Sequence, residues 1–204
     1  MKKLDWKKDL KQFYTPSSKE FSIIDVPSMN FLKIDGHGDP NKTPQYPLAV
    51  EALYSVSYKI KFSLKSKGID YTVFPLEGLW WVDDMTKFSV EKKDEWNWTM
   101  MIAQPEWVDV DVFRKACEAV SAKKELPVIS RLRFELYAEG LAVQILYWGA
   151  YADEGPTIAR MHEFIHKKSM VTNGKHHEIY LADPRRTAPE KLKTILRQPV
   201  RKSV

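Results

Sequence analysis

The residues with the clearest chemical potential lie near the C-terminus, in the segment HHEIYL at residues 176 to 181. Its composition predicts a β-strand, in which alternation places Glu178 and Tyr180 on one face and His177 and Ile179 on the other. Glu178 therefore shares no face with the aliphatic residues of its own strand. Because a carboxylate beside a phenol can accept a proton or hold a polar ligand, the surroundings of Glu178 decide what this segment does.

A second such segment is HEFIH, residues 162 to 166, which fits the pattern H-E-x-x-H of zinc hydrolases on a predicted helix. That chemistry needs His162 and His166 in a cleft, Glu163 beside a metal-bound water, and a third ligand. No H-x-x-G-x-x-H extension follows. His162 flanks the apolar side of the helix and His166 leads into solvent, so we expect surface histidines, no metal and no other cofactor.

Hydrophobic periodicity predicts the elements that position these residues. The predicted helices span residues 45 to 67, 110 to 124 and about 157 to 168, and a last helix begins at Thr187 with Glu190 completing a capping box. The predicted strands lie within residues 31 to 41, 70 to 82, 95 to 108, 130 to 140, 141 to 151 and 176 to 181.

The two halves of the chain share an order of strand, turn marked by Gly and Pro, helix and further strand. This order predicts an α+β fold built from two similar units, with a groove at their junction, where ligand sites tend to lie. We expect a polar N-terminal arm at residues 1 to 20 and a single domain at 21 to 204, made of pseudo-repeats at about 21 to 108 and 126 to 204.

The amino-acid composition limits the classes of protein to which this chain can belong. The chain has 204 residues, of which 44% are apolar and 12% aromatic, enough for a substantial core. No segment reaches the roughly 18 continuous apolar residues of a membrane helix. The single cysteine, Cys117, excludes an internal disulfide and suits the cytoplasm.

The net charge of +5 raises the question of nucleic acid. Basic residues cluster at the two ends, which we interpret as solvated tails, and no basic stripe is interleaved with aromatic residues. We therefore do not expect a nucleic-acid partner. The sequence leaves the oligomeric state open.

Two surroundings for Glu178 stay open from the residues alone. One is the solvent-facing side of a sheet, with the aromatic residues forming ordinary core. The other is an aromatic cavity, supplied by Trp81 on one strand and Trp96 and Trp98 on another. Such a cavity with one acid could hold a flat, hydrophobic ligand through stacking and charge attraction.

Several segments together resemble the GyrI-like small-molecule-binding family: IDGHGDPN, LYSVSYKIKF, LEGLWW, QPEWV, WGAYADEGPTI and HHEIYLADPRRTAPEKLKTILRQPV. The resemblance covers roughly residues 18 to 200. It implies a duplicated β-α-β-β fold of SHS2 type, similar to effector-binding domains, with a ligand groove between the halves and an acidic residue on the last strand, here Glu178. The family motif His-Ile-Gly-Pro-Tyr is replaced here by Tyr147-Trp148-Gly149-Ala150-Tyr151, which lacks the histidine and the proline.

Some stand-alone members that this chain resembles hydrolyse cyclopropanoid DNA-alkylating compounds and so detoxify them. The resemblance implies metal-independent addition of water, with Glu178 as the base and Tyr137 or Trp81 binding the carbonyl oxygen. The alternative is a non-catalytic protein that binds drugs or modulates DNA gyrase. A transcription-regulator role is not expected, because residues 1 to 20 are too few for a DNA-binding domain. The expected ligand-binding residues are Tyr180, Trp80, Trp96, Trp98, Tyr147, Tyr54 and Met100.

Overall fold

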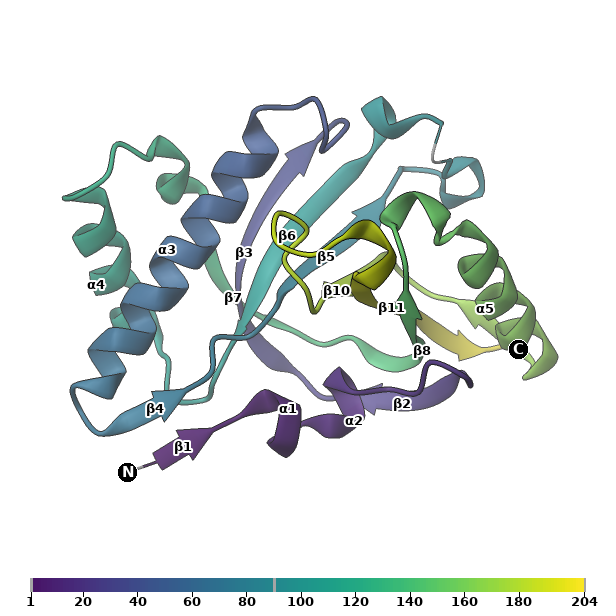
Figure 1. The fold of residues 1–204 in the computed structure, drawn as a ribbon, viewed down its shortest axis with the longest axis horizontal. Helices are drawn as coiled ribbons and strands as arrows, with labels where there is room; N and C mark the ends of the chain where they lie inside the picture. The colour runs from purple at the N-terminus through teal and green to yellow at the C-terminus, as the bar shows by residue number, and fades with distance from the viewer. Residues whose placement is uncertain (1, 90, 204) are drawn as a thin grey trace. The chain divides into compact units, whose positions relative to one another are not determined.

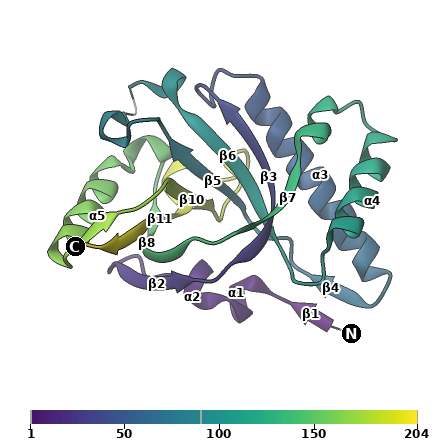
Figure 2. The ribbon, with the colours of Figure 1, turned by 180° about the vertical axis from the view of Figure 1, so that it is seen from behind.

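The computed structural model describes residues 2 to 89 and 91 to 203, and the chain divides into two compact units (Figures 1 and 2). Unit 1 consists of Met1–Trp6 and Met29–Tyr137, and unit 2 of Lys7–Ser28 and Ala138–Val204. Both combine helices with antiparallel strands, which confirms the α+β class.

Unit 1 is an antiparallel sheet in the order β5-β6-β3-β7, with helix α3 across one face (Figure 2). Helix α3 forms because Ala52, Val56 and Ile60 recur every fourth residue, and all three are fully buried. The elements of unit 1 are β1 (Lys2–Leu4), β3 (Met29–His37), α3 (Gln45–Lys65), β4 (Ile69–Tyr71), β5 (Leu76–Trp81), β6 (Asn97–Gln104), α4 (Val110–Ser121) and β7 (Arg133–Tyr137), and β1 pairs in parallel with β4.

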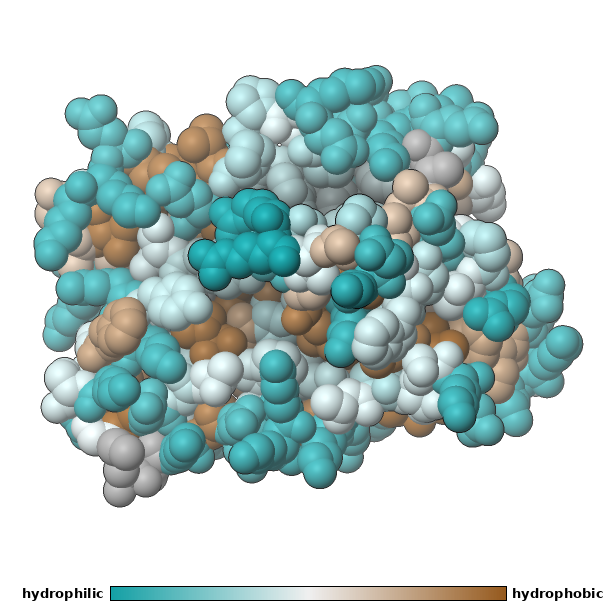
Figure 3. Space-filling model, in the orientation of Figure 1, coloured by the Kyte–Doolittle hydropathy of each residue, from teal (hydrophilic) through white to brown (hydrophobic). Residues whose placement is uncertain are grey.

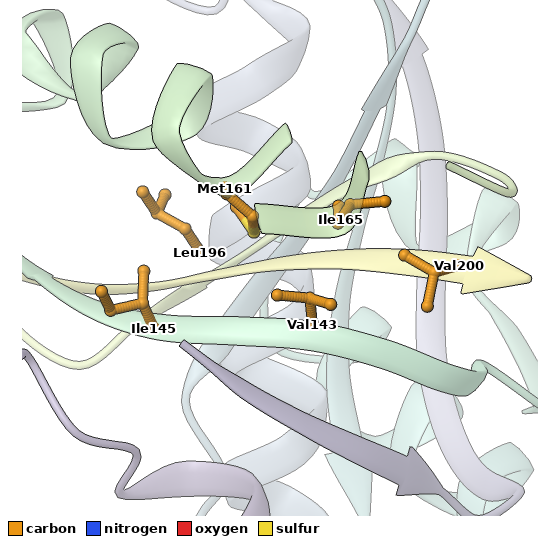
Figure 4. Packing of buried hydrophobic residues seen from close by; sticks show 6 residues of the cluster. All are labelled: Val143, Ile145, Met161, Ile165, Leu196 and Val200. Carbon is orange, nitrogen blue, oxygen red and sulfur yellow. The ribbon is translucent and has the colours of Figure 1, made fainter. Parts of the chain in front are cut away.

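Unit 2 has a sheet in the order β2-β8-β11-β10, with β9 added to the far end of β11. Helix α5 packs Met161 and Ile165 onto apolar residues of β8 and β11 (Figure 4). The elements of unit 2 are α2 (Lys11–Tyr14), β2 (Ser22–Val26), β8 (Gly140–Trp148), α5 (Gly155–Lys167), β9 (Met170–Thr172), β10 (His176–Tyr180) and β11 (Lys193–Lys202). Helix α1 (Trp6–Asp9) is shared by the two units, because Trp6 belongs to unit 1 and the rest of the helix to unit 2.

The predicted C-terminal helix is wrong. Only a short 3-10 turn, Pro189–Lys191, precedes the long strand β11, which pairs with β8 on one side and β10 on the other. All residues from Thr194 to Val200 are buried, whereas Arg201 and Lys202 at the end of the strand are exposed. A strand buried on both faces carries apolar residues without strict alternation, and short apolar runs of this kind do not distinguish helix from strand.

The interpretation of the basic ends as solvated tails is also wrong. Lys193–Lys202 is the strand β11. The N-terminal segment is tied to β8 of unit 2 by hydrogen bonds from the Gln144 side chain to the carbonyl of Gln12 and from the amide of Leu146 to the carbonyl of Ser17.

The length and hydropathy of the helices decide whether any of them could cross a membrane. No helix within residues 2–89 and 91–203 is both long and apolar enough to cross a membrane. On the face shown in Figure 3, hydrophilic residues predominate and hydrophobic residues occupy small areas between them.

Candidate functional site

Glu178 lies on the face of the unit 2 sheet that α5 covers. It pairs with Leu196 of β11, which in turn pairs with Ile145 of β8, and both belong to the apolar cluster beneath α5. Directly paired residues of antiparallel strands point to the same face, so Glu178 points to the helix side. The predicted alternation within β10 is confirmed, since Ile179 pairs with Ile195 in the opposite orientation.

The Glu178 carboxylate lies close to two neighbours on its own strand. The phenol of Tyr180 donates a hydrogen bond of 2.8 Å to Oε2, and Nε2 of His176 lies 3.5 Å from Oε1. The exposed fraction of the Glu178 side chain is 15%, against 5% for His176. The Glu178 side chain is therefore partly exposed, neither fully buried nor in bulk water. A group that contacts a ligand needs such partial exposure.

A turn between β8 and α5 lies against this face. The Tyr147 phenol donates a 3.2 Å hydrogen bond to the carbonyl of Ala150, and the Tyr151 ring packs edge-on against Tyr180 with centroids 5.5 Å apart. Gly149 makes the turn possible, because its φ is +142° and a Cβ there would lie 2.5 Å from the Tyr147 hydroxyl oxygen. Glycine alone adopts such a backbone without strain.

Glu154 follows this turn directly and is the acid that sequence reasoning missed. It is only 3% exposed, and within the described part of the chain its Oε1 has no hydrogen-bond partner. Burial raises the pKa of Glu154 to about 9, the charge of Glu178 adds to the rise, and the hydroxyl of Thr194 opposes it in part. The positive end of α5 would favour the carboxylate by about 0.3–1 kcal/mol, too little to reverse a shift of this size.

The pKa of the neighbouring Tyr147 phenol is raised as well. Burial raises the pKa of the Tyr147 phenol, and the charges of Glu154 and Asp153 raise it further. The phenol therefore stays protonated at neutral pH and can donate a hydrogen bond. Tyr147 and Tyr180 both pair with Thr194, one from each side, so the two predicted ligand-binding phenols share the helix-side face.

The HEFIH segment lies on α5, with Met161 and Ile165 buried and both histidines at the surface, as predicted. His162 reaches the surface, but part of its ring is buried. This partial burial, and after it the charge of His176, lower the pKa of His162. Among the described residues, no cluster of three His, Cys, Asp or Glu side chains could hold a metal ion. The segment is helix surface in this fold.

The other predicted site residues lie in unit 1, most of them in an aromatic cluster. Trp80 and Trp98 pair across β5 and β6, and Tyr46 of α3 contacts both rings at 6.3 and 5.5 Å. Trp96 packs edge-on against Trp80 at 5.5 Å and stacks on Phe88 at 4.8 Å. Tyr46 is a member that the sequence did not indicate.

The indole groups of this cluster are fixed by the backbone. The Trp98 Nε1 donates to the carbonyl of Gly38 at 3.2 Å and the Trp96 Nε1 to that of Ser89 at 2.9 Å. The Trp98 ring lies directly over Gly36, where a Cβ would come within 2.0 Å of it. Met100, also predicted, is completely buried on the same strand as Trp98.

The two predicted oxygen-binding residues are not brought together. Trp81 pairs with Asn97 and so points to the sheet face opposite Trp80. Tyr137 lies on β7, at the far edge of the unit 1 sheet, where its ring meets Phe31 at 6.0 Å and the Lys33 ammonium at 5.3 Å. Tyr54 stacks on Tyr58 along α3 at 6.3 Å.

The strands that carry Tyr137 and Tyr147 follow each other in the chain but do not pair. Strand β8, with Tyr147, is paired on both edges, by β11 and β2, which leaves no edge for β7. The roles of Tyr137, Trp81 and Tyr54 stay predictions.

The opposite face of the unit 2 sheet carries a buried ion cluster. Glu139 lies 2.7 Å from Nδ1 of His177 and 3.0 Å from Nη1 of Arg197, and Glu139 and Arg197 side chains are each 2% exposed. Arg197 also donates to Gln144 and to the carbonyl of Phe13. Burial would raise the pKa of Glu139, but the charges of His177 and Arg197 and their hydrogen bonds outweigh it and lower the pKa to about 2.

Two depressions lie on the surface of unit 1. One of about 640 Å³ is lined by α4 and the segment after it, including Cys117 and Pro127, and one of about 440 Å³ by His37, Asp84 and their neighbours. Neither is lined by a predicted site residue. Cys117 is half-buried, and burial followed by the charge of Glu118 raises the pKa of its thiol to about 11, so it is not a reactive thiolate.

The chain thus has an antiparallel α+β frame with an acid–phenol pair on the sheet face that a helix covers. The chain belongs to the family of GyrI-like small molecule binding domains, whose model matches residues 19–201. The comparison with curated proteins finds no match.

Solved structures from Listeria innocua are similar over nearly the whole chain. An uncharacterized conserved protein is 40% identical, with a TM-score of 0.90 and coverage of 97% of this chain and 100% of that one. A protein described as a hydrolase is 40% identical with a TM-score of 0.88, covering 98% and 100%. A third, also described as a hydrolase, is 39% identical with a TM-score of 0.85, covering 97% and 100%.

Proposed function

We propose that this protein binds hydrophobic aromatic small molecules and hydrolyses reactive cyclopropanoid, DNA-alkylating compounds, with detoxification as the result. The observation that carries the proposal is the Glu178 carboxylate, partly open to solvent and oriented by Tyr180 at 2.8 Å. The hydrolase descriptions of relatives at about 40% identity support catalysis over binding alone.

The proposed reaction adds water to a cyclopropane ring conjugated to a dienone. Glu178 takes one proton from water, the water oxygen bonds to a ring carbon, and a ring C–C bond breaks. Its electron pair moves to the carbonyl oxygen, which then takes up a proton. Stabilising that oxygen and positioning the water each lower the barrier, and general base catalysis alone contributes about 10²–10⁴-fold. No metal takes part in this scheme.

The architecture extends the proposal to a duplicated β-α-β-β fold. In unit 1 the strands around α3 stand in the order β3-β6-β5, and in unit 2 the strands around α5 stand in the order β8-β11-β10. The helix follows the first strand of each set in the chain. The groove expected between the two halves stays a prediction.

Mass spectrometry separates catalysis from binding. The protein is incubated with a hundredfold excess of a dienone-fused cyclopropanoid alkylator, and intact and water-added compound are quantified over time. We expect many equivalents of the water-added product for each equivalent of protein. Retention of one equivalent of intact compound, with no product above the protein-free rate, would instead support a non-catalytic drug-binding protein.

A further inference from the structure

Glu154 is a buried carboxyl group that the scheme above does not use. Its side chain is almost wholly removed from water, and the structure gives Oε1 no partner among the described residues. The hydroxyl of Thr194 is likewise buried and faces this carboxyl group, whose pKa it lowers in part, and no other partner of that hydroxyl lies within the same part of the chain. Buried polar atoms are nearly always paired, so the unpaired Oε1 of Glu154 indicates a site that completes its hydrogen bonds with a ligand or water.

The fold brings this carboxyl group to the acid–phenol pair. Thr194 lies between Tyr147 and Tyr180 on the helix-side face, and Tyr180 holds Glu178. The 3-10 turn Tyr151–Asp153 ends at Glu154, and its first ring packs against Tyr180. The charge of Glu178 acts on Glu154 directly.

We propose that Glu154 is a second catalytic residue of this site, which gives up a proton while Glu178 accepts one. The inference rests on the proposed function. Because burial, and after it Glu178, raises the pKa of Glu154 to about 9, this carboxyl group carries a proton at neutral pH. A carboxyl group that keeps its proton beside a second acid can act as the general acid of the site. The other titratable groups around them are His176 of β10, Tyr147 of β8, Asp153 of the preceding turn and His162 of α5.

The pair completes the proton balance of ring opening. Glu178 takes a proton from the attacking water, and the electron pair of the broken C–C bond reaches the carbonyl oxygen, which takes the proton of Glu154. After product release, the proton on Glu178 passes to Glu154 and restores the starting state. The net change is the addition of one water, with no oxidant or further reactant.

The test compares pH–rate profiles of the wild-type protein with Glu154→Gln, Glu154→Asp and Glu178→Gln, with exposed neighbour Asp153→Asn as the control. The substrate is the same dienone-fused cyclopropanoid. We expect wild-type kcat/KM to fall above about pH 9, at the pKa of Glu154. Glu154→Gln should lose about 100-fold or more in kcat and lose that falling limb, whereas Glu154→Asp should restore part of the rate and Asp153→Asn should match wild type.

Infrared spectroscopy gives a readout independent of turnover. A protonated carboxyl band at pH 7 that disappears in Glu154→Gln and persists in Asp153→Asn is the expected result. The inference is overturned by absence of that band, or by Glu154→Gln with wild-type rate and pH profile. If Glu154→Gln behaves as wild type while Glu178→Gln is inactive, only the role of Glu154 fails. Full activity of Glu178→Gln, or no turnover by the wild type, contradicts the proposed function itself.

Discussion

At the residue scale, the site depends on how each carboxyl group is solvated. Glu178 keeps some contact with water and a phenol donor, whereas Glu154 has neither a donor to Oε1 among the described residues nor appreciable exposure. Sequence alternation predicted that Glu178 and Tyr180 share one face of β10, but not that α5 covers this face. It could not indicate Glu154, because ADEGP reads as an ordinary polar turn and burial depends on the later packing of that turn.

Glutamate 154 should make stability depend on pH. A carboxyl group whose folded pKa is raised, here from 4.5 to about 9, stabilises the fold fully below pH 4.5 and loses that contribution as pH rises towards 9. We predict that the free energy of unfolding of wild type falls over this range by at most about 1.4 kcal/mol per pH unit relative to Glu154→Gln. Urea unfolding at pH 5, 7 and 9 measures the difference, and parallel pH curves for the two proteins would contradict it.

At the element scale, the turn between β8 and α5 positions both the phenols and Glu154. Gly149→Ala should displace the Tyr147 ring, because the new Cβ would lie 2.5 Å from its hydroxyl oxygen on a backbone with φ of +142°. We predict a loss of about 1–3 kcal/mol in stability and a clear fall in ligand affinity. Thermal unfolding and calorimetric titration with the cyclopropanoid test this.

Gly155→Ala is the matched control for that variant. Nothing lies within 4 Å of a Cβ at Gly155. This control should keep both stability and affinity near wild type. Equal behaviour of the two alanine variants would show that the turn does not position Tyr147.

The strand β11 shows where sequence reasoning failed among the elements. Leu192, Ile195 and Leu196 fit one side of a helix, and Thr187 with Glu190 fits a capping box. The strand forms because β8 and β10 both pair with it, a long-range effect that no local pattern contains. Helices α3, α4 and α5 were predicted correctly since each has a long apolar period with polar positions between.

Arg197 of β11 anchors the N-terminal segment through a buried cluster of charges. Glu139→Gln should leave Arg197 and His177 without their shared carboxylate and cost about 3 kcal/mol in the free energy of unfolding. Glu135→Gln in unit 1, whose ion pair with Arg133 is 40% exposed on the glutamate side, should cost less than about 1 kcal/mol. Urea unfolding compares the two, and equal losses would contradict the role of burial.

The same cluster predicts an acid response opposite to that of Glu154. Its lowered pKa, about 2, means that Glu139 stabilises the fold above pH 4.5 and loses this contribution as pH falls from 4.5 towards 2.

At the scale of the whole molecule, composition gave the right general class but not the partner. The net charge of +5 is spread over surfaces where basic and acidic side chains pair, such as Lys42 with Asp94 and Lys124 with Glu51. We predict no affinity for duplex DNA tighter than about 1 µM at 0.15 M salt, by fluorescence anisotropy of a labelled duplex. Nanomolar binding at that salt concentration would show that the charge serves a nucleic-acid partner.

The central claim is that the Glu178 carboxylate is the base that takes a proton from water in the proposed hydrolysis. Its most direct test is the single-turnover rate of cyclopropanoid hydrolysis by Glu178→Gln, measured beside calorimetric affinity, with the exposed α5 variant Glu163→Gln as control. We predict a rate at least about 100-fold below wild type, affinity within about tenfold, and wild-type behaviour for Glu163→Gln. A Glu178→Gln protein that hydrolyses the compound at the wild-type rate would contradict the account.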